Sequence, residues 1–272
     1  MSDNRSFKTR YADDGFVLPL DIITAQQAAE LRTDLEAAES ELADDAERLT
    51  LLRTYPDRLL PSFDNLIRNP KIIEAVSQIL GPDLLVWGAG LFIKEPNSTN
   101  IVSWHQDLTY WGLDDAEETT CWVALSDAST ASGAMKFVPG SHKERAVDHI
   151  DTFDKNNLLS RGQEIAVDVD ENDAVAAELS PGQASIHHGH LFHASGPNST
   201  NDRRIGTAIR YIKASLKQND GTKSLVAHVS GEDKWHHFKV APPPKSRLHD
   251  DDFELCRQDA LAKRKILFAG VD

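Results

Sequence analysis

A histidine and an aspartate two positions apart, His105 and Asp107, form the first pattern in the sequence that could carry chemistry. Side chains two residues apart point to the same face of an extended strand, so an imidazole nitrogen and a carboxylate oxygen could reach one metal ion. Many chains contain an H-x-D pair that serves only as a polar cluster, so the pair alone is a hypothesis about a metal site.

A histidine-rich segment downstream could complete such a site. Its candidates for a third ligand are His187, His188, His190 and His193. Two histidines and one carboxylate are the ligand set of non-haem Fe(II) oxygenases, because they leave three coordination positions open for a bidentate cosubstrate and dioxygen. Residue spacing does not choose among the four histidines.

Two adjacent arginines, Arg203 and Arg204, follow this segment. A guanidinium presents a planar fork of donors to a carboxylate, so either residue could bind the distal carboxylate of 2-oxoglutarate near the metal. A basic pair on the surface is the alternative. If residues 205–212 form a strand, the two arginines point to opposite faces. One face would then carry Arg204, Gly206, Ala208 and Arg210.

Helices are expected first along the chain and strands later. Apolar residues at helical spacing predict helices over residues 25–43, 61–68 and 70–81, after a short strand at 16–18. Short apolar runs between turn residues predict strands at 84–87, 91–94, 102–104, 120–125, 136–138, 164–167, 184–187 and 205–212. Strands without alternating helices favour an antiparallel sandwich or barrel.

One domain spanning residues 1–272 is the expected organisation. Its core would cover about 84–212, with helical support over 1–83 and an extension over 213–272 that ends in a charged helix at 251–268. The polar stretch 143–172 is either an exposed insertion or a lid over a pocket.

The composition narrows the classes of partner. With 43 acidic and 29 basic residues the net charge is −14, which argues against nucleic acid because phosphate binding needs a basic face. Two distant cysteines, Cys121 and Cys256, favour a reducing, cytoplasmic setting. We expect no membrane association, because the sequence shows neither a secretory signal nor an apolar stretch long enough to span a bilayer.

Three motifs in order make the chain resemble the phytanoyl-CoA dioxygenase family over residues 13–212. They are His105-Gln106-Asp107, the segment 122–142 with Phe-Val-Pro-Gly-Ser-His at its end, and His193-Ala-Ser-Gly-Pro-Asn followed by Arg204. The resemblance implies a mainly β chain with a double-stranded β-helix (jelly-roll, cupin-like) core, flanking N-terminal helices and a C-terminal helix.

The resemblance also implies a set of site residues. Iron would be held by His105, Asp107 and His193, and the cosubstrate 2-oxoglutarate by Arg204 and Ser195 with Trp122 at the border of the same pocket. The other histidines of the segment take packing or outer roles. Related halogenases lack the carboxylate ligand, so the presence of Asp107 implies hydroxylation, with O2 consumed and succinate and CO2 released.

A small polar substrate is expected, since the acidic chain shows few basic residues for the phosphates of an acyl-CoA. Several stretches resemble a branch that includes 2-aminoethylphosphonate-type hydroxylases. An aminoalkylphosphonate, N-methylated or not, could meet Arg161, Asn157 and Lys94 through its anion, and Tyr110 or Trp111 through its amine.

The alternatives are an amino acid, an ectoine-like or secondary metabolite, an acyl-CoA, a desaturation or epimerisation at the same site, and an inert metal-binding barrel. The chain is expected to be a monomer or a homodimer. Core packing remains the alternative for Tyr110 and Trp111, and a solvated loop charge is the alternative for Arg161.

Overall fold

The computed structural model describes residues 5–267 of the chain. Contacts between residues divide the chain into two compact units. The first unit takes in the chain up to Ala28 together with Phe92–Thr109 and Trp122–Gly206. The second takes in Ala29–Leu91, Tyr110–Cys121 and the chain from Thr207 on.

The first unit is built mainly from antiparallel strands. A four-stranded sheet has the order β3-β10-β5-β8, and in a larger sheet β1, β9, β4 and β11 are successive neighbours. Strands β4 and β11 run on into the second unit. The elements are α1 (Phe7–Asp14), β1 (Phe16–Asp21), β3 (Val102–His105), β4 (Glu118–Ala124), β5 (Met135–Phe137), β6 (His149–Asp151), β7 (Gln163–Ile165), β8 (Val175–Ala177), β9 (Gln183–His188), β10 (His193–Ser195) and β11 (Arg204–Lys213), with short 3-10 turns η1 (Leu108–Tyr110), η2 (Ser141–Glu144) and η3 (Glu171–Asp173).

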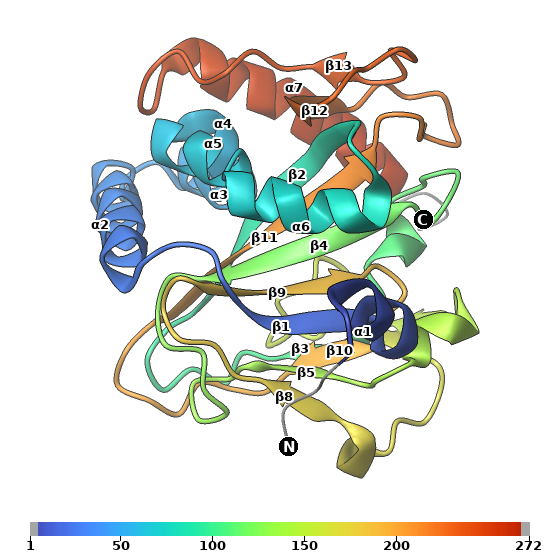
Figure 1. Ribbon diagram of the computed structural model, residues 1–272. Coiled ribbons are helices and arrows are strands. Elements are labelled where there is room, and N and C mark those ends of the chain that lie inside the picture. Colours follow the sequence, from blue (N-terminus) through green and yellow to red (C-terminus); the bar gives the residue numbers. More distant parts are fainter. Residues whose placement is uncertain (1–4, 268–272) are drawn as a thin grey trace. The chain divides into compact units, whose positions relative to one another are not determined.

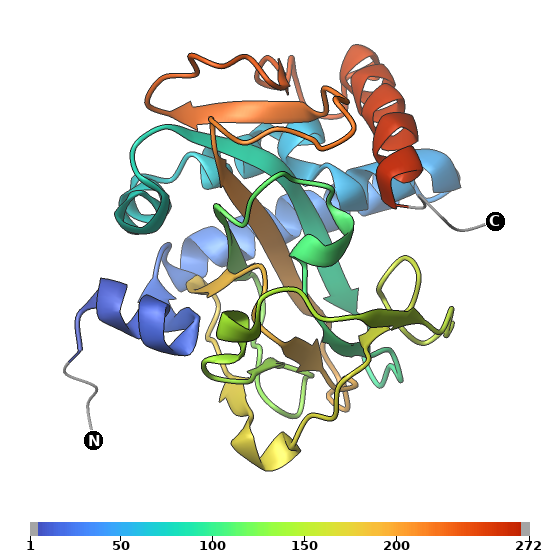
Figure 2. The same cartoon turned by 90° about the vertical axis from the view of Figure 1, so that its right-hand side faces the viewer.

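The second unit combines helices with the continuation of the larger sheet, where β11, β2, β12 and β13 are successive neighbours. The C-terminal helix α7 lies beside α3 and α4 (Figures 1 and 2). Its elements are α2 (Ala25–Glu41), α3 (Ala46–Thr54), α4 (Pro56–Leu59), α5 (Pro61–Ile67), α6 (Pro70–Leu80), β2 (Leu84–Lys94), β12 (Leu225–Ser230), β13 (Lys239–Val240) and α7 (Asp250–Leu267).

Local sequence explains why these segments adopt their forms. In α6, Pro70 occupies the first turn and the side chain of Asn69 caps the Lys71 N–H, while Ile72, Val76 and Leu80 are buried on one face. Strand β4 is buried along its whole length, which fits its run of β-branched and aromatic residues. The expected fold, mainly β with helices before and after the core, is confirmed.

The expected element boundaries hold with two kinds of exception. The strands predicted at 84–87 and 91–94 are one strand, β2, which continues through Gly88 and Gly90. Several short or late elements were not predicted, among them β10, which carries His193; the others are α1, α3, α4, β6, β8, β12 and β13. For α1 the local signals were present, because Ser6 caps the helix by accepting a hydrogen bond from Thr9 N and Gly15 ends it at φ 83°. The stretch 143–172, left open as insertion or lid, contains the β6–β7 hairpin.

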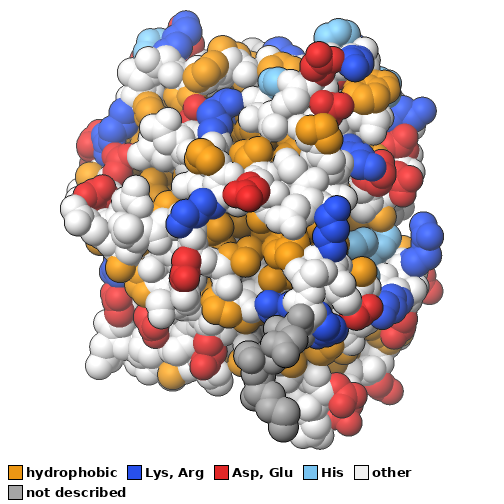
Figure 3. Space-filling view, in the orientation of Figure 1, with side chains coloured by type: hydrophobic (Ala, Val, Ile, Leu, Met, Phe, Trp, Pro, Cys, Tyr) orange, Lys and Arg blue, Asp and Glu red, His pale blue; other side chains and the backbone are white. Residues whose placement is uncertain are grey.

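Charged side chains of both signs are scattered over the face shown in Figure 3, and the described residues in that view form no large single-sign field. Within residues 5–267, no helix is long and apolar enough to cross a bilayer.

Candidate active site

His105 and His193 face each other because their strands pair. Strands β3 and β10 are antiparallel, and the register places His193 opposite His105. Side chains of directly opposed residues in such a pair are close neighbours. The two imidazole rings accordingly have centroids 4.0 Å apart.

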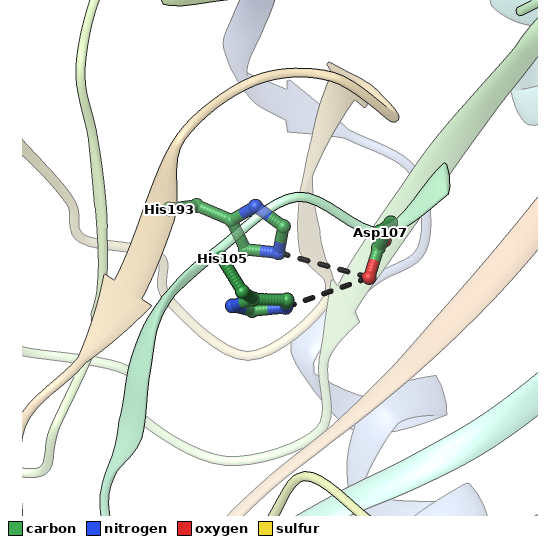
Figure 4. Close-up of side chains that lie close together, drawn as sticks. All are labelled: His105, Asp107 and His193. Atoms are coloured by element: carbon green, nitrogen blue, oxygen red, sulfur yellow. Dashed lines mark ion pairs between the residues drawn. The ribbon is translucent and has the colours of Figure 1, made fainter. Parts of the chain in front are cut away.

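Asp107 completes the group from the bend that follows β3 rather than from the strand itself. Its Oδ1 lies 3.5 Å from His105 Nε2 and 3.9 Å from His193 Nε2. Figure 4 shows both imidazoles directed at this carboxylate. One ligand atom from each of the three residues lies within 4.8 Å of the others, close enough to share one metal ion.

The hydrogen bonds of both histidines leave the correct nitrogen available for a metal. Nδ1 of His105 donates to the Ser103 carbonyl and Nδ1 of His193 donates to the Leu191 carbonyl, each at 2.9 Å. Nδ1 of each ring therefore carries a proton, and Nε2 is the nitrogen that faces Asp107 and could bind a metal. Burial and the nearby His105 hold the pKa of His193 well below its usual value, which favours the neutral, metal-binding form.

The structure separates the four histidines that the sequence could not rank. His187 is buried and its Nε2 lies 3.9 Å from Asp107 Oδ2, but it is not part of the three-residue group. The His188 ring has neighbouring rings in His142 and His190, at 5.3 and 5.4 Å. Only His193 has its Nε2 close to both His105 and Asp107.

Gln106 lies between His105 and Asp107 and makes hydrogen bonds to several other segments. Nothing in the sequence indicated this role. Its amide nitrogen donates to the carbonyls of Arg145 and His190, and its amide oxygen accepts from Val147 N. Its backbone N–H donates to His149 Nε2 at 3.1 Å. These bonds fix the backbone that carries both ligands, and no sequence pattern announces them.

Arg204 is a buried cation at the start of β11. The Arg204 side chain is 2% exposed, lies over the Trp122 ring at 5.4 Å, and donates from Nη1 to the Phe92 carbonyl. Its Nε is buried and makes no hydrogen bond within the described residues. Burial lowers the pKa of Arg204 to about 10, so the guanidinium remains charged at neutral pH.

Lys94, expected from the sequence to meet the substrate anion, lies beside Ser195 and close enough to Arg204 to interact with its charge. It is 0% exposed, and its Nζ donates to Ser195 Oγ at 2.7 Å and to the Ser195 and Gly196 carbonyls. Burial, followed by the charge of Arg204, lowers the pKa of Lys94 to about 6. The amine is therefore neutral near pH 7 beside the charged Arg204, and an anionic ligand placed there would favour its protonation.

The remaining expected substrate residues do not form one group. Arg161 makes an ion pair with Asp151 through Nε and Nη2, and Asn157 Nδ2 donates to Ser103 Oγ at 2.7 Å. Both residues therefore hold the loop between β6 and β7 in place. Trp111 is buried in the second unit, and the side chain of Tyr110 lies outside the described part of the structure.

Several known proteins are similar to this chain in sequence or in fold. The profile of the phytanoyl-CoA dioxygenase (PhyH) family matches residues 11–206. A probable alpha-ketoglutarate-dependent hypophosphite dioxygenase of Stutzerimonas stutzeri is 27% identical over 75% of this chain and 77% of its own length. A probable phytanoyl-CoA dioxygenase of Caenorhabditis elegans is 25% identical over 92% of this chain and 74% of its own. The solved structure of the non-heme monooxygenase ThoJ, in its apo form, is 32% identical, covers 96% of this chain and 97% of that chain, and superposes with a TM-score of 0.87.

Proposed function

Since the chain belongs to the phytanoyl-CoA dioxygenase family and is an Fe(II)- and 2-oxoglutarate-dependent dioxygenase, we propose that it hydroxylates a C–H bond of a small polar metabolite. We propose an aminoalkylphosphonate as the substrate. The observation that carries the reaction is the convergence of His105 Nε2, His193 Nε2 and an Asp107 oxygen within 4.8 Å.

These three residues would hold the iron. In both histidines the Nδ1 proton is engaged by a backbone carbonyl and Nε2 faces the other ligands, and the carboxylate would offset part of the charge of a divalent ion. When bound, the iron supplies dioxygen activation coupled to conversion of 2-oxoglutarate to succinate and CO2. Two histidines and one carboxylate would leave positions on the ion for the cosubstrate and dioxygen.

Arg204, Lys94 and Ser195 would bind the distal carboxylate of 2-oxoglutarate. The buried Nε of Arg204 supplies a donor, and Lys94 adds a second positive charge that an incoming carboxylate would stabilise. Trp122 would hold the plane of the guanidinium in place. In this role Lys94 binds the cosubstrate rather than the substrate.

The phosphonate assignment is supported by the similarity to a dioxygenase of hypophosphite, which is also a phosphorus oxyanion. Arg161 and Asn157 keep the role proposed for them only if the substrate competes with Asp151 and Ser103 for their donors. An acyl-CoA, an amino acid or a cyclic amino acid of the ectoine type would be the alternative substrates.

The test is turnover under defined conditions. The protein would be loaded anaerobically with Fe(II), 2-oxoglutarate and one candidate from a panel of phosphonates, amino acids and acyl-CoAs, then exposed to oxygen. We expect succinate in proportion to a product heavier by one oxygen atom, with 2-aminoethylphosphonate or its N-methyl form among the best substrates.

Other results would each revise the proposal. A product lighter by two hydrogens, or one of unchanged mass, would indicate desaturation or epimerisation. Iron binding without any 2-oxoglutarate consumption would indicate an inert barrel. The control variant Asp107→Ala should abolish succinate formation, because it removes one of three ligands.

A further inference from the structure

The two oxygens of Asp107 face different neighbours. Oδ1 lies 3.5 Å from His105 Nε2 and 3.9 Å from His193 Nε2, among the atoms that could share a metal ion. Oδ2 lies 3.9 Å from Nε2 of His187, which is not one of the three proposed ligands. All four residues belong to the first unit. The carboxylate thus has one oxygen beside the histidine ligands and the other beside a further imidazole.

Strand pairing and aromatic rings hold His187 in place. Strand β9 pairs with β1 in a register that puts His187 opposite Phe16, and the Phe16 and Phe137 rings have centroids 5.0 Å apart. The His187 ring lies 5.1 Å from the Phe137 ring and 4.9 Å from the His193 ring. Because His187 and Phe137 are both buried, the imidazole has little freedom to move away from the proposed metal ligands.

His188, the next residue of β9, has different neighbours, because successive side chains of a strand point to opposite faces. Its ring lies 6.2 Å from that of Tyr11 in α1, and its Nδ1 accepts a hydrogen bond from His190 N. Of the two adjacent histidines, His187 therefore lies beside the proposed metal ligands and His188 beside α1.

A carboxylate that binds a metal ion through one oxygen keeps part of its negative charge on the other. Protein donors to that outer oxygen fix the orientation of the ligand, and their loss weakens metal binding. The Asp107 side chain is only 11% exposed, and a buried anionic oxygen is costly without a donor. The 3.9 Å between Oδ2 and His187 Nε2 exceeds a typical hydrogen bond by about 1 Å. Hydrogen bonds of active sites often close such a gap when the site binds its ligand.

We propose that His187 is a positioning residue of the metal site, which donates a hydrogen bond from Nε2–H to Asp107 Oδ2 and thereby leaves Oδ1 to bind the metal. This inference deepens the proposed function and rests on its metal site. In His187 the proton would have to be on Nε2, whereas His105 and His193 carry it on Nδ1. The aromatic packing around His187 limits how far its donor can turn away from Asp107.

The experiment measures metal binding by the full chain, without 2-oxoglutarate or substrate. Co(II) serves as the probe, because its visible absorption reports the number of its ligands, and competition with a chelator gives Kd. The variants are His187→Phe, which keeps a ring and removes the donor, and His187→Gln, which restores an N–H donor. His188→Phe is the matched control, since it makes the same change at the neighbouring position of β9.

We expect His187→Phe to raise Kd for Co(II) about ten- to a hundredfold, the usual effect of losing an outer hydrogen bond to a metal ligand. His187→Gln should recover part of this loss, and His188→Phe should leave Kd unchanged. The absorption per bound Co(II) should not increase in His187→Phe, because the number of protein ligands stays the same.

Nuclear magnetic resonance of the wild type tests the hydrogen bond itself and does not depend on how well a variant folds. With 15N-labelled histidine, the Nε2–H proton signal of His187 should move downfield when Zn(II) is added, because the hydrogen bond to Asp107 then forms. Absence of the signal from His187→Gln assigns it. A residue that only packs against Phe137 would not show this shift.

Three outcomes would overturn the inference. They are an unchanged Kd in His187→Phe, a proton on Nδ1 of His187 in the Zn(II) form, and a rise in Co(II) absorption in His187→Phe, which would make His187 a ligand. Equal losses of affinity in His187→Phe and His188→Phe would also overturn it, because they would indicate a general effect on β9. Failure of the proposed function is distinguishable, because it would appear as absent 2-oxoglutarate consumption by a wild type that binds Co(II).

Discussion

Trp122 lies so close to the backbone of Gly206 that no side chain fits between them. A Cβ added at Gly206 would fall 1.9 Å from Trp122 Cζ2, well inside contact distance. The ring would have to move and would then leave the Arg204 guanidinium, which lies over it. Gly206→Ala should therefore lower the free energy of unfolding by about 1–3 kcal/mol and raise KM for 2-oxoglutarate.

Chemical denaturation and steady-state kinetics would check this prediction. The double variant Gly206→Ala, Trp122→Phe is the control, because phenylalanine lacks the second ring whose atoms clash. It should regain most of the stability without regaining the KM. If Gly206→Ala unfolds like the wild type, the packing described between these residues is wrong.

Lys94 should make cosubstrate binding depend on pH. Its pKa is lowered from 10.5 to about 6 by burial and by Arg204, so between these values the folded protein carries a neutral amine. A carboxylate placed beside it favours the charged form and raises this pKa. Binding of 2-oxoglutarate at pH 8 should thus take up as much as one proton, and affinity should fall as pH rises.

Calorimetry of 2-oxoglutarate binding in two buffers of different ionisation enthalpy measures this proton, with Lys94→Met as the variant that should show almost none. A wild type whose binding enthalpy is independent of the buffer would contradict the prediction.

The pH dependence of the free energy of unfolding gives a second check. Between pH 6 and 10.5 the unfolded chain binds the additional proton, so wild-type stability relative to Lys94→Met should rise with pH.

At the level of residues, the motifs of the sequence point to the three residues that the structure brings together, but not to the side chains around them. His105, Asp107 and His193 come together, but Asp107 lies on a bend beyond β3, so the strand argument for the H-x-D pair applies to His105 alone. Lys94 could not be placed from sequence, because its neighbours Ser195 and Arg204 are about a hundred residues away. Long-range pairing decides such positions, and local pattern does not report it.

Among the elements, α7 carries a buried ion pair within the helix, and both of its members also make hydrogen bonds to other segments. Lys263 pairs with Asp259, which also accepts hydrogen bonds from Tyr55 Oη and Leu225 N. Removing one partner leaves the other charge buried and uncompensated. Lys263→Met should therefore cost about 3–5 kcal/mol in the free energy of unfolding, which denaturant titration would measure.

A double-mutant cycle tests the pair directly. Asp259→Asn together with Lys263→Met should cost less than Lys263→Met alone, because no unpaired charge remains. Lys265→Met, an exposed lysine of the same helix, is the matched control and should change stability by less than about 0.5 kcal/mol. Equal losses at positions 263 and 265 would show that the buried pair does not hold the helix.

Helices and strands with clear capping residues and a clear apolar face could be predicted from the sequence. Those without an apolar face were missed. Pro70 and the buried face of α6 fix that helix from sequence, whereas the eight residues of α1 have no apolar face and bury only Tyr11. Strand β2 was divided in two because Gly88 and Gly90 resemble a turn. The space they provide is used by Lys263 and Arg210, which only the tertiary structure reveals.

For the whole molecule, the amino-acid composition argued against a nucleic-acid partner but gave no information about the active site. A net charge of −14 and two cysteines fit many enzymes. Three motifs in order named the family, and the match over residues 11–206 confirms it. The chain beyond residue 206 contributes Arg210 and Lys263. Their cation–π partners, Trp111 and Trp87, come from other segments, so the sequence around the two cations does not reveal these contacts.

Metal binding should stabilise the molecule unevenly. All three proposed ligands belong to the first unit, so an ion bound there favours the folded form of β3 and β10 directly. At a concentration one hundred times Kd, an ion that binds only the folded state adds about 2.7 kcal/mol. Fe(II) under nitrogen should therefore raise Tm and slow amide hydrogen exchange most in β3 and β10, and chelation with EDTA should reverse both effects.

The variant Asp107→Asn should lose most of this gain in Tm, because an amide oxygen lacks the negative charge of the carboxylate. An equal rise in Tm in wild type and Asp107→Asn would place the ion elsewhere in the chain.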